Sequence, residues 1–589
     1  MWVIYFLIFL QFELPPGCEA KIKAHIKNNT NVTLELPKIY RLSSPWWITA
    51  PQEIVLNQDI LPNQERIITF SVSSSPSAPV GQIGEVKYRV LARNYEIEPS
   101  YLIISFKTTL NKPTNLQANS SYPYDKVILT WKDNSNFEEG YEIWRKGVDE
   151  NWTKIVTIET PGQGTDLISY TDNSVSPFND YFYKVRAISG SITSEFSDTC
   201  WVTTSPILAT KGVSLCPSSG KNIIRAGNRI HVVYSDDGKV FYRYSNDNGL
   251  TWSTCECIEP GFNPTITYDG NNIWVAYMAD TTYLNAHVRY AKRQANGTWI
   301  KKDGPHGFNP IIVYVGPSDW QNEGIYLGYS DYKVIGKGEP PQTQYSKVCL
   351  DWIIPNYDRI RINVDSVSFS VNYPPSFTLG KIIKNNEEKV MMIYKLPSSN
   401  FLRYMDVLDK EDLEIYDPQT ATGEKGSGIL PFIGNQNFAC FKSLSDDKIK
   451  VIKFDDEYYK EWIWYPNKNS QDYYEIGLNP QILNESNVSV LVFEKNGDIY
   501  LQKIMGNLIF SPLKITMLPQ IDGEIRPNII LRKIPSRIYT GILHSVGDSM
   551  IVYRERFTHP LPIYEPIEDN LTLLDIPPNN SQRISLFDN

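Results

Sequence analysis

The sequence has few of the residues from which metal sites and disulfide frameworks are built. Its 589 residues include only 7 cysteines and 6 histidines, and both are spread along the chain. An odd, dispersed set of cysteines excludes a dense disulfide scaffold. Cys255 and Cys257 have no second Cys or His pair nearby, so a zinc site is weakly indicated, whereas Cys200 and Cys216 could bridge. We expect no cofactor, although the aspartate-rich turns could hold calcium adventitiously.

Positive charge is also scarce. Lys and Arg number 57 against 66 Asp and Glu, which gives a formal net charge of −9. A chain with this balance has no global basic field to hold a polyanion, so we expect no nucleic-acid partner. The sequence also lacks the motifs G-x-x-x-x-G-K-[ST], H-E-x-x-H and G-x-S-x-G and shows no Ser-His-Asp or Cys-His constellation.

Long hydrophobic runs are absent. The apolar run Met1–Phe12 is shorter than the about 20 residues that a membrane-spanning helix needs, so we do not expect an integral membrane protein. Residues 1–20 allow two interpretations. One is an export signal with small residues ahead of a cleavage point after Ala20, and the other is a first β-strand that continues to Leu14.

Sustained 3.6-residue apolar periodicity is nearly absent as well. Short alternating runs rich in Ile, Val, Tyr, Trp and Thr recur instead, bounded by Gly, Asn, Asp and Pro. This pattern predicts an all-β chain. The aromatic fraction of 13%, with 37 Tyr and 14 Trp, fits side chains that pack strands at their ends.

Residues 21–110 form the first expected unit. Ala20 to Ile26 and Glu85 to Val90 alternate, and turn sequences separate the strands between them. The stretches Pro45-Trp46-Trp47-Ile48 and Ala78-Pro79-Val80-Gly81 resemble those of immunoglobulin-like domains appended to exported bacterial or archaeal proteins. The resemblance implies a β-sandwich of about 90 residues.

Residues 112–205 form the second unit. They start with Pro113-Thr114-Asn115-Leu116 and end with the alternating run Asp180 to Ala187, and they resemble a fibronectin type III domain. Trp131 is then expected in the core. Tyr181 is the expected corner tyrosine, whose hydroxyl bonds back to the preceding backbone.

Residues 207–557 contain an internal repeat. A proline precedes a strand at intervals of 46 to 64 residues, at Pro217, Pro264, Pro310, Pro374, Pro431, Pro480 and Pro527. A period in the upper forties with about four strands is typical of propeller blades. Seven blades are favoured and six remain open. Only three strands fit after Pro527, so we expect residues 209–215 to supply the fourth and close the ring, and residues 558–589 to form a tail.

The run from Ser245 to Trp252 (SNDNGLTW) resembles the Asp-box, S-x-D-x-G-x-x-W, of sialidases and other bacterial propellers. The resemblance implies a folding turn away from the active face, so Ser245, Asp247, Gly249 and Trp252 are expected to be structural. Sialidases also need three arginines that clamp a carboxylate. Only Arg225 stands near such a position here and it lacks the flanking Ile-Pro, so classical sialidase activity is not expected.

The repeat also indicates a candidate ligand face. If each blade has strands A to D, the loops between B and C lie opposite the Asp-box turn. Acidic and tyrosine side chains are expected there in three successive blades: Asp236, Asp237, Asp280, Tyr283, Asp331 and Tyr332. Carboxylates at roughly 5–10 Å could hydrolyse a glycoside, but aspartate is also among the commonest turn residues.

Three functions follow from this organisation. The first is a non-catalytic, exported or cell-surface protein whose sandwiches are spacers and whose propeller binds a glycan or a protein partner. The second is a glycoside hydrolase or lyase acting from the B–C face, and the third is a structural component of an envelope or filament. The sequence favours the first, leaves enzyme activity uncertain and does not indicate an oligomeric state.

Overall fold

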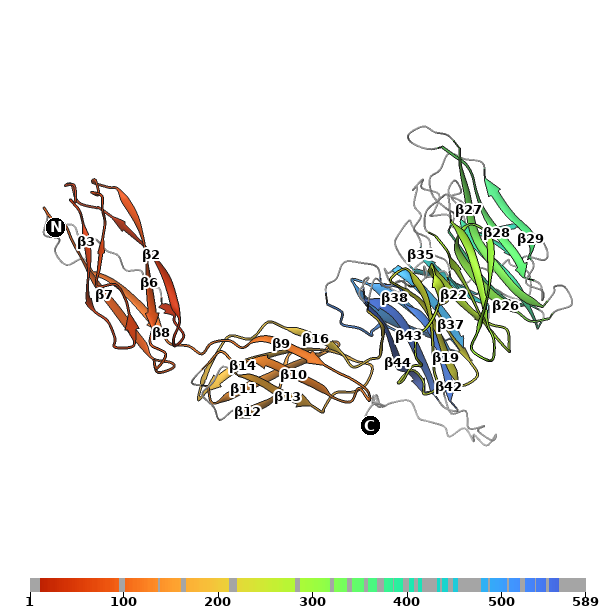
Figure 1. Ribbon diagram of the computed structural model, residues 1–589, viewed down its shortest axis with the longest axis horizontal. Helices are drawn as coiled ribbons and strands as arrows, with labels where there is room; N and C mark the ends of the chain where they lie inside the picture. The colour runs from red at the N-terminus through yellow and green to blue at the C-terminus, as the bar shows by residue number, and fades with distance from the viewer. Residues whose placement is uncertain are drawn as a thin grey trace, which may run out of the picture.

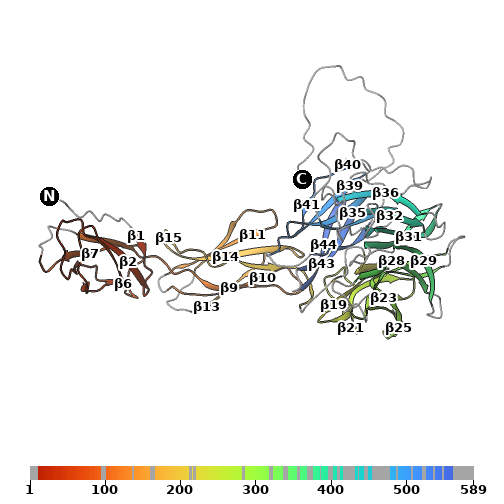
Figure 2. The same ribbon diagram turned by 90° about the horizontal axis from the view of Figure 1, so that it is seen from above.

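The computed structural model describes most of the chain, in residues 11–94, 101–135, 138–159, 166–210, 215, 220–280, 286–317, 323–335, 342–353, 359–367, 376–384, 386–395, 402–406, 412–415, 432–434, 437–442, 449–453, 478–485, 488–505, 508–519, 525–534, 537–546 and 550–560. Within these ranges every regular element is a β-strand, so the prediction of an all-β chain is confirmed. No helix in the described part of the chain has the length and apolar character needed to cross a membrane. Figure 1 and Figure 2 show two sandwiches in a row, followed by a larger group of sheets.

The first sandwich packs a five-stranded sheet against a three-stranded one. The sheets have the orders β1-β8-β7-β3-β5 and β2-β6-β4. Burial alternates along β2 and β6 because one face of each strand lies on the core and the other faces water. The strands are β1 (Gln11–Glu13), β2 (Glu19–Lys27), β3 (Lys38–Ser43), β4 (Ile48–Thr49), β5 (Glu53–Val55), β6 (Glu65–Ser74), β7 (Ile83–Leu91) and β8 (Tyr101–Lys107).

This sandwich begins before the expected boundary at residue 21. β1 pairs in parallel with β8, and Leu14, which follows it, is 1% exposed in the core. Cleavage after Ala20 would therefore remove β1, a buried leucine and the first two residues of β2. The rest of the expected first strand, residues 3–10, lies outside the described residues.

The second sandwich is formed by strands between Thr114 and Thr203. Trp131 is fully buried in its core, as predicted. The Tyr181 hydroxyl accepts a hydrogen bond of 3.0 Å from the amide of Ser176, which confirms the expected corner tyrosine. The strands are β13 (Leu167–Asp172), β10 (Val127–Lys132) and β9 (Thr114–Asn119) in one sheet, and β12 (Thr153–Glu159), β11 (Gly140–Gly147), β14 (Asp180–Ser189), β15 (Ile192–Thr193) and β16 (Cys200–Thr203) in the other.

The described residues that follow form seven sheets, which we number 1 to 7 along the chain. Each consists mainly of antiparallel neighbours in sequence order. Sheets 1 to 3 are β18 (Ile223–Ala226), β19 (Arg229–Asp236), β20 (Lys239–Ser245) and β21 (Glu256–Pro260); β22 (Phe262–Tyr268), β23 (Ile273–Met278), β24 (His287–Arg293) and β25 (Trp299–His306); and β26 (Phe308–Val315), β27 (Gly324–Ile335), β28 (Gln342–Ile353) and β29 (Arg359–Val367). Sheets 4 and 5 are β30 (Ser376–Lys384), β31 (Glu387–Lys395), β32 (Leu402–Asp406) and β33 (Asp412–Ile415); and β34 (Phe432–Ile433), β35 (Phe438–Lys442) and β36 (Ile449–Lys453). Sheet 6 is β37 (Leu478–Glu485), β38 (Val488–Lys495), β39 (Asp498–Met505), β40 (Leu508–Ile509) and β41 (Leu513–Lys514), and sheet 7 is β42 (Asn528–Ile534), β43 (Arg537–Val546), β44 (Met550–Pro560) and β17 (Ile207–Ala209).

The seven sheets contact one another in a closed sequence. β18, β22, β26, β30, β34, β37 and β42 each touch the next in this order, and β42 touches β18. β17 completes sheet 7 by pairing with β44. The closing strand is thus residues 207–209, not the expected 209–215. β44 runs to Pro560, three residues past the expected boundary, and the remainder of the expected tail, 561–589, lies outside the described residues.

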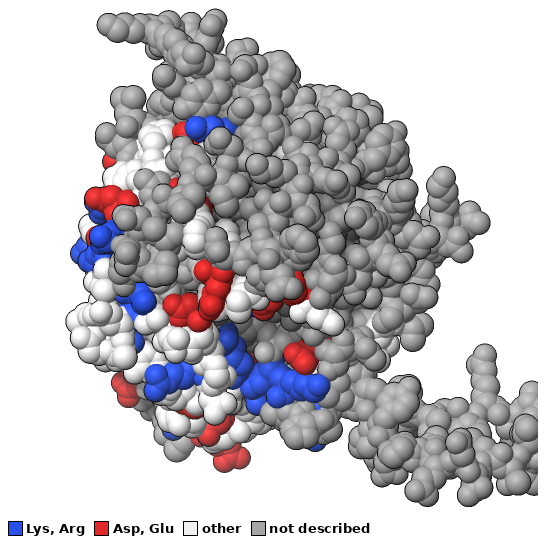
Figure 3. Space-filling view, turned by 90° about the vertical axis from the view of Figure 1, so that its right-hand side faces the viewer, with Lys and Arg blue, Asp and Glu red and all other residues white. Residues whose placement is uncertain are grey.

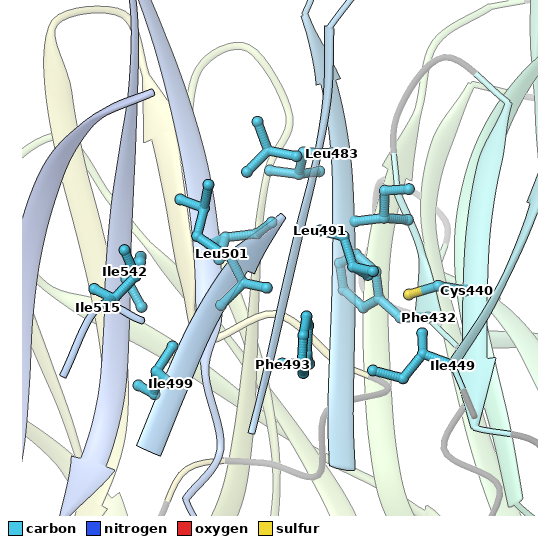
Figure 4. Packing of buried hydrophobic residues seen from close by; sticks show 14 of the residues in the cluster. Phe432, Cys440, Ile449, Leu483, Leu491, Phe493, Ile499, Leu501, Ile515 and Ile542 are labelled. Atoms are coloured by element: carbon cyan, nitrogen blue, oxygen red, sulfur yellow. The ribbon is translucent and has the colours of Figure 1, made fainter. Parts of the chain in front are cut away.

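Strands of these sheets are buried on both faces. β23 is buried at every position and β38 at all but the last, in contrast to the alternation in the sandwiches. The reason is that neighbouring sheets cover both sides of each strand. Figure 4 shows one such core, in which Phe432 and Ile449 of sheet 5, Phe493 of sheet 6 and Ile542 of sheet 7 pack together.

The repeated G-x-N-P lead-in has a local structural cause. Asn263, Asn309 and Asn479 have φ angles of 49°, 49° and 51°, in the left-handed region that asparagine tolerates better than most residues. At each of them the pairing with the following strand shifts register, which marks a β-bulge. The motif therefore starts β22, β26 and β37 in the same way.

Polar side chains connect neighbouring first strands. Asn222 Nδ2 donates to the Pro264 carbonyl at 2.8 Å, and Thr265 Oγ1 donates to the Pro310 carbonyl at 3.1 Å. On the other side, the Asn222 amide donates to Asn528 Oδ1 at 2.8 Å. Asn222 thus occupies the position of Thr265, so Lys221 stands where Pro264 does. The expected first anchor, Pro217, lies four residues earlier and outside the described residues.

The second sandwich is joined to sheets 6 and 7 by a buried ion pair. Arg554 Nη2 of β44 lies 2.7 Å from Asp180 Oδ1 of β14, and both side chains are fully buried. The other oxygen of Asp180 accepts a 3.0 Å hydrogen bond from the Met517 amide. The rings of Phe178 and Tyr553 meet edge to face beside this pair, with centroids 6.1 Å apart. The joint is therefore a packed core rather than a flexible linker.

Candidate functional site

The turn between β20 and β21 contains the predicted structural motif. Asp247 Oδ1 accepts hydrogen bonds from Ser245 Oγ and from the Thr251 amide, both at 2.8 Å. Gly249 has a φ angle of +90°, and its carbonyl accepts a 3.0 Å hydrogen bond from Trp252 Nε1. Burial opposes ionisation of Asp247, but the hydrogen bonds from Thr251 and Ser245 together lower its pKa. All donors and acceptors belong to the turn itself, so the motif shapes the chain locally.

The predicted ligand face begins with the turn between β19 and β20. Asp237 and Gly238 have φ angles of 49° and 71° and join the paired residues Asp236 and Lys239. A two-residue Asp-Gly turn with two positive φ angles is the preferred connection of a β-hairpin. Asp237 is exposed and Asp236 is half-buried at the strand end. The hairpin by itself accounts for the presence of Asp237.

Asp331 and Tyr332 were expected in a loop, but the structure places both inside β27. This strand pairs with β28 from Ile325 to Ile335, past the expected end of the strand. Asp331 Oδ1 lies 2.8 Å from His306 Nδ1, and Oδ2 lies 3.3 Å from Lys347 Nζ. The Asp331 carboxylate is therefore engaged between two basic side chains.

The other two predicted residues follow β23. Asp280 is half-buried just after the strand, as expected from the sequence. Tyr283 lies outside the described residues, and so does the side chain of Tyr332. Among the described residues, no group of three or more His, Cys, Asp or Glu could hold a metal ion.

A cavity of about 270 Å³ lies among the first strands of sheets 1 to 5. The walls combine apolar residues such as Ile266, Ile312 and Phe432 with the tyrosines Tyr268 and Tyr314. Lys221, Arg225 and Lys381 also line it, and no Asp or Glu is among its described lining residues. The cavity is thus lined by both polar and apolar groups, and its described charged lining residues are all basic.

The two lysines of this cavity lie near each other. Burial and the positive charge of Lys381 lower the pKa of Lys221 to about 8. The Lys221 ammonium lies 5.8 Å from the centroid of the phenyl ring of Phe432, which belongs to sheet 5. Lys381 Nζ is 2.5 Å from Glu388 Oε1, whose other oxygen accepts a 2.8 Å hydrogen bond from the Gly316 amide. Within the described residues Lys221 has no corresponding carboxylate.

Arg225 contributes less to the cavity than the lysines. Its Nη2 donates to Asn248 Oδ1 in the β20–β21 turn at 3.2 Å, and burial lowers the pKa of its guanidinium. This hydrogen bond directs Arg225 toward the β20–β21 turn, whereas an arginine that clamps a carboxylate must direct its guanidinium at the ligand. Sequence reasoning missed Lys221 and Lys381 because they lie 160 residues apart. The one available signal was that Lys221 occupies the position in the repeat at which other sheets have a proline.

The outer surface of the seven sheets carries both signs of charge. Figure 3 shows basic and acidic side chains interspersed on the described part of one face. Oppositely charged side chains of sheets 1 and 2 also form ion pairs: Arg293 Nη2 lies 2.7 Å from Glu256 Oε1, and Arg289 Nε lies 2.7 Å from Asp303 Oδ1.

Comparisons with known proteins give structural neighbours only. No protein-family model matches the chain, and no curated protein matches it. An Fn3-like protein from Clostridium thermocellum is 24% identical over 16% of this chain and 92% of its own, with a TM-score of 0.14. A segment of two fibronectin type III domains from chicken tenascin is 11% identical over 32% and 94%, with a TM-score of 0.19. Saccharomyces cerevisiae Sqt1 is 8% identical over 64% of this chain and 90% of its own, with a TM-score of 0.32.

Proposed function

We propose that sheets 1 to 7 are the blades of a seven-bladed propeller that contains one Asp-box turn, between β20 and β21. The closed sequence of first-strand contacts supports this arrangement, as does the completion of sheet 7 by β17 from the start of the ring. Joining both ends of the ring in one sheet leaves no exposed edge at the closure.

We propose further that the chain is a non-catalytic binding protein of the cell surface or the extracellular space. The two sandwiches act as a spacer, and the propeller binds a glycan or a protein partner on the face of its B–C loops. The observation that carries this proposal is the joint between Asp180 and Arg554, since a buried ion pair holds the propeller in one orientation at the end of the spacer. Residues 11–14, which belong to the first sandwich, would then remain in the exported chain.

The environments of the acidic residues favour binding over hydrolysis. A glycosidase needs a protonated acid and a second carboxylate across the scissile bond. Asp237 belongs to a tight hairpin turn, and Asp331 is engaged by His306 and Lys347. Asp236 and Asp280, both half-buried at strand ends, are the remaining acids of the predicted face.

A glycan array with the full-length chain tests this proposal, scored for binding and for release of reducing sugar. We expect retention of particular glycans without release. Asp280→Ala should weaken retention, and Asp303→Ala, on the outer strand β25, should leave it unchanged. Sugar release that disappears in Asp280→Ala, with the fold intact by circular dichroism, would show a glycosidase instead. If no glycan is retained, the protein-partner alternative is tested by cross-linking at the B–C face, through a photoreactive residue at position 237.

A further inference from the structure

The cavity between the first strands contains charge that the proposed binding face does not use. Lys221 and Lys381 both line this cavity, and the carboxylate of Glu388 is paired with Lys381. Lys381 has Glu388 as its counterion, so the uncompensated positive charge in the cavity is that of Lys221, which also faces the charge of Lys381. The arrangement is favourable when an anion lies between the two groups.

We propose that this cavity is a binding site for an oxyanion, a phosphate or carboxylate group, held by Lys221 and Lys381. The cavity of about 270 Å³ has room for about nine water molecules, at about 30 Å³ each, and therefore accommodates a tetrahedral oxyanion with part of its hydration shell. Lysine supplies up to three donors as a compact charge, which suits an anion without a fixed orientation.

The position of Lys221 explains how the site arises within a repeat. Prolines occupy the equivalent position in sheets 2, 3 and 6, where their rings carry no charge. The Lys221 carbonyl accepts a 2.9 Å hydrogen bond from the Ile266 amide, so the backbone of sheet 1 still keeps its place beside sheet 2. The side chain is then free to extend toward Phe432 and Lys381 on the other side of the ring.

The site differs from the proposed B–C face in location and in ligand. Arg225, which lines the cavity, bonds to Asn248 in the Asp-box turn, and that turn lies at the end of the blades opposite the B–C loops. The oxyanion could be a free ion or a group carried by a larger molecule, and the two sources can be separated by size.

The experiment is a phosphate titration of the full-length chain at constant ionic strength and pH 7, with the melting temperature as the readout. We expect a saturable rise in the wild type. Lys221→Met should raise the half-saturating phosphate concentration roughly tenfold, as for the loss of one charge-assisted hydrogen bond. Lys301→Met, which removes an ion-paired lysine on β25, is the matched control and should titrate like the wild type.

Two further arms make the outcome decisive. Since the pKa of Lys221 is about 8, phosphate binding should weaken between pH 7 and 9 in the wild type, but not in Lys221→Arg, whose guanidinium stays charged. Glycerol 1-phosphate in place of phosphate tests whether the cavity accepts a larger ester. A non-saturable rise, or a saturable one that Lys221→Met leaves intact, would overturn the proposal.

Discussion

At the scale of single residues, Gly249 shows why the turn between β20 and β21 needs a glycine. A Cβ atom at this position would lie 2.0 Å from Cε1 of the buried Tyr553, and the φ angle of +90° disfavours any other residue. Gly270 has a φ angle of +92° but no atom within 4 Å of its Cβ position. The two glycines therefore share a backbone conformation and differ only in their neighbours.

This pair separates backbone strain from packing. Gly270→Ala should lower the free energy of unfolding by about 1 kcal/mol, the cost of a left-handed alanine. Gly249→Ala should lower it by a further 1–3 kcal/mol or so, because Tyr553 must move. Urea denaturation of both variants measures the difference. Equal losses would mean that the ring of Tyr553 shifts without cost and that the turn is not packed as described.

His231 makes stability depend on pH. The side chain is buried against Tyr242, with Nδ1 2.6 Å from the hydroxyl, and burial with the charges of Arg229 and Arg293 lowers its pKa to about 4. Below pH 6.5 the unfolded chain binds a proton here that the folded chain does not bind until near pH 4. Protonation of His231 should therefore lower the free energy of unfolding by about 1 kcal/mol for each unit by which the pH falls between 6.5 and 4.

The comparison of His231→Gln with the wild type isolates that contribution. The variant should be less stable at pH 7 but should lose less stability between pH 6.5 and pH 4.5. Parallel profiles for His231→Gln and the wild type would contradict the buried, neutral state of His231.

At the scale of elements, alternation was enough to predict strands but not their length or their partners. The sandwich strands were recognisable because one face meets water, and the aromatic cores around Trp131 and Tyr181 formed as expected. β27 was predicted too short, because its paired extension beyond Ser330 depends on β28 and not on its own sequence. The ion pairs of Asp331 with His306 and Lys347 come from separate strands, so no local pattern could show them.

Asn222 is the element-scale link that experiment can test most directly. Its side chain donates to carbonyls of both β22 and β19, at Pro264 and Val233, and its amide donates to Asn528. Asn222→Ala leaves two buried carbonyls without their donor, so the free energy of unfolding should fall by about 2–4 kcal/mol. Asn271→Ala, in an exposed turn of sheet 2, should change it by less than about 0.5 kcal/mol. A loss for Asn222→Ala no larger than for Asn271→Ala would show that the polar connections between first strands are not needed.

At the scale of the whole molecule, the joint determines whether the chain behaves as one body. The first and second sandwiches are also in contact, since Val80 packs on the core that contains Leu110. The second sandwich holds the ring through Asp180 and Arg554, which are 374 residues apart in the sequence. No pattern in a single sequence could indicate this pair, because neither residue stands out from other strand residues.

Breaking the joint should affect both stability and shape. Asp180→Ala leaves the Arg554 guanidinium buried without its carboxylate, so the free energy of unfolding should fall by about 3–5 kcal/mol. The exposed pair of Arg289 and Asp303 provides the matched control, since Asp303→Ala should cost less than about 1 kcal/mol. Small-angle X-ray scattering should show a broader range of maximum dimensions only for Asp180→Ala, as the sandwich swings relative to the ring.

Replacing both partners separates the burial of charge from the packing of the joint. In Asp180→Ala combined with Arg554→Met, no unpaired charge remains, and apolar side chains often substitute for a buried ion pair without loss. The double variant should therefore recover most of the stability, while Phe178 and Tyr553 still hold the two parts together. If it recovers stability but scatters like Asp180→Ala, the ion pair itself sets the orientation. If it recovers both the stability and the wild-type scattering profile, apolar packing is sufficient to hold the two parts in place. The contribution of the ion pair is then to select this one packing arrangement.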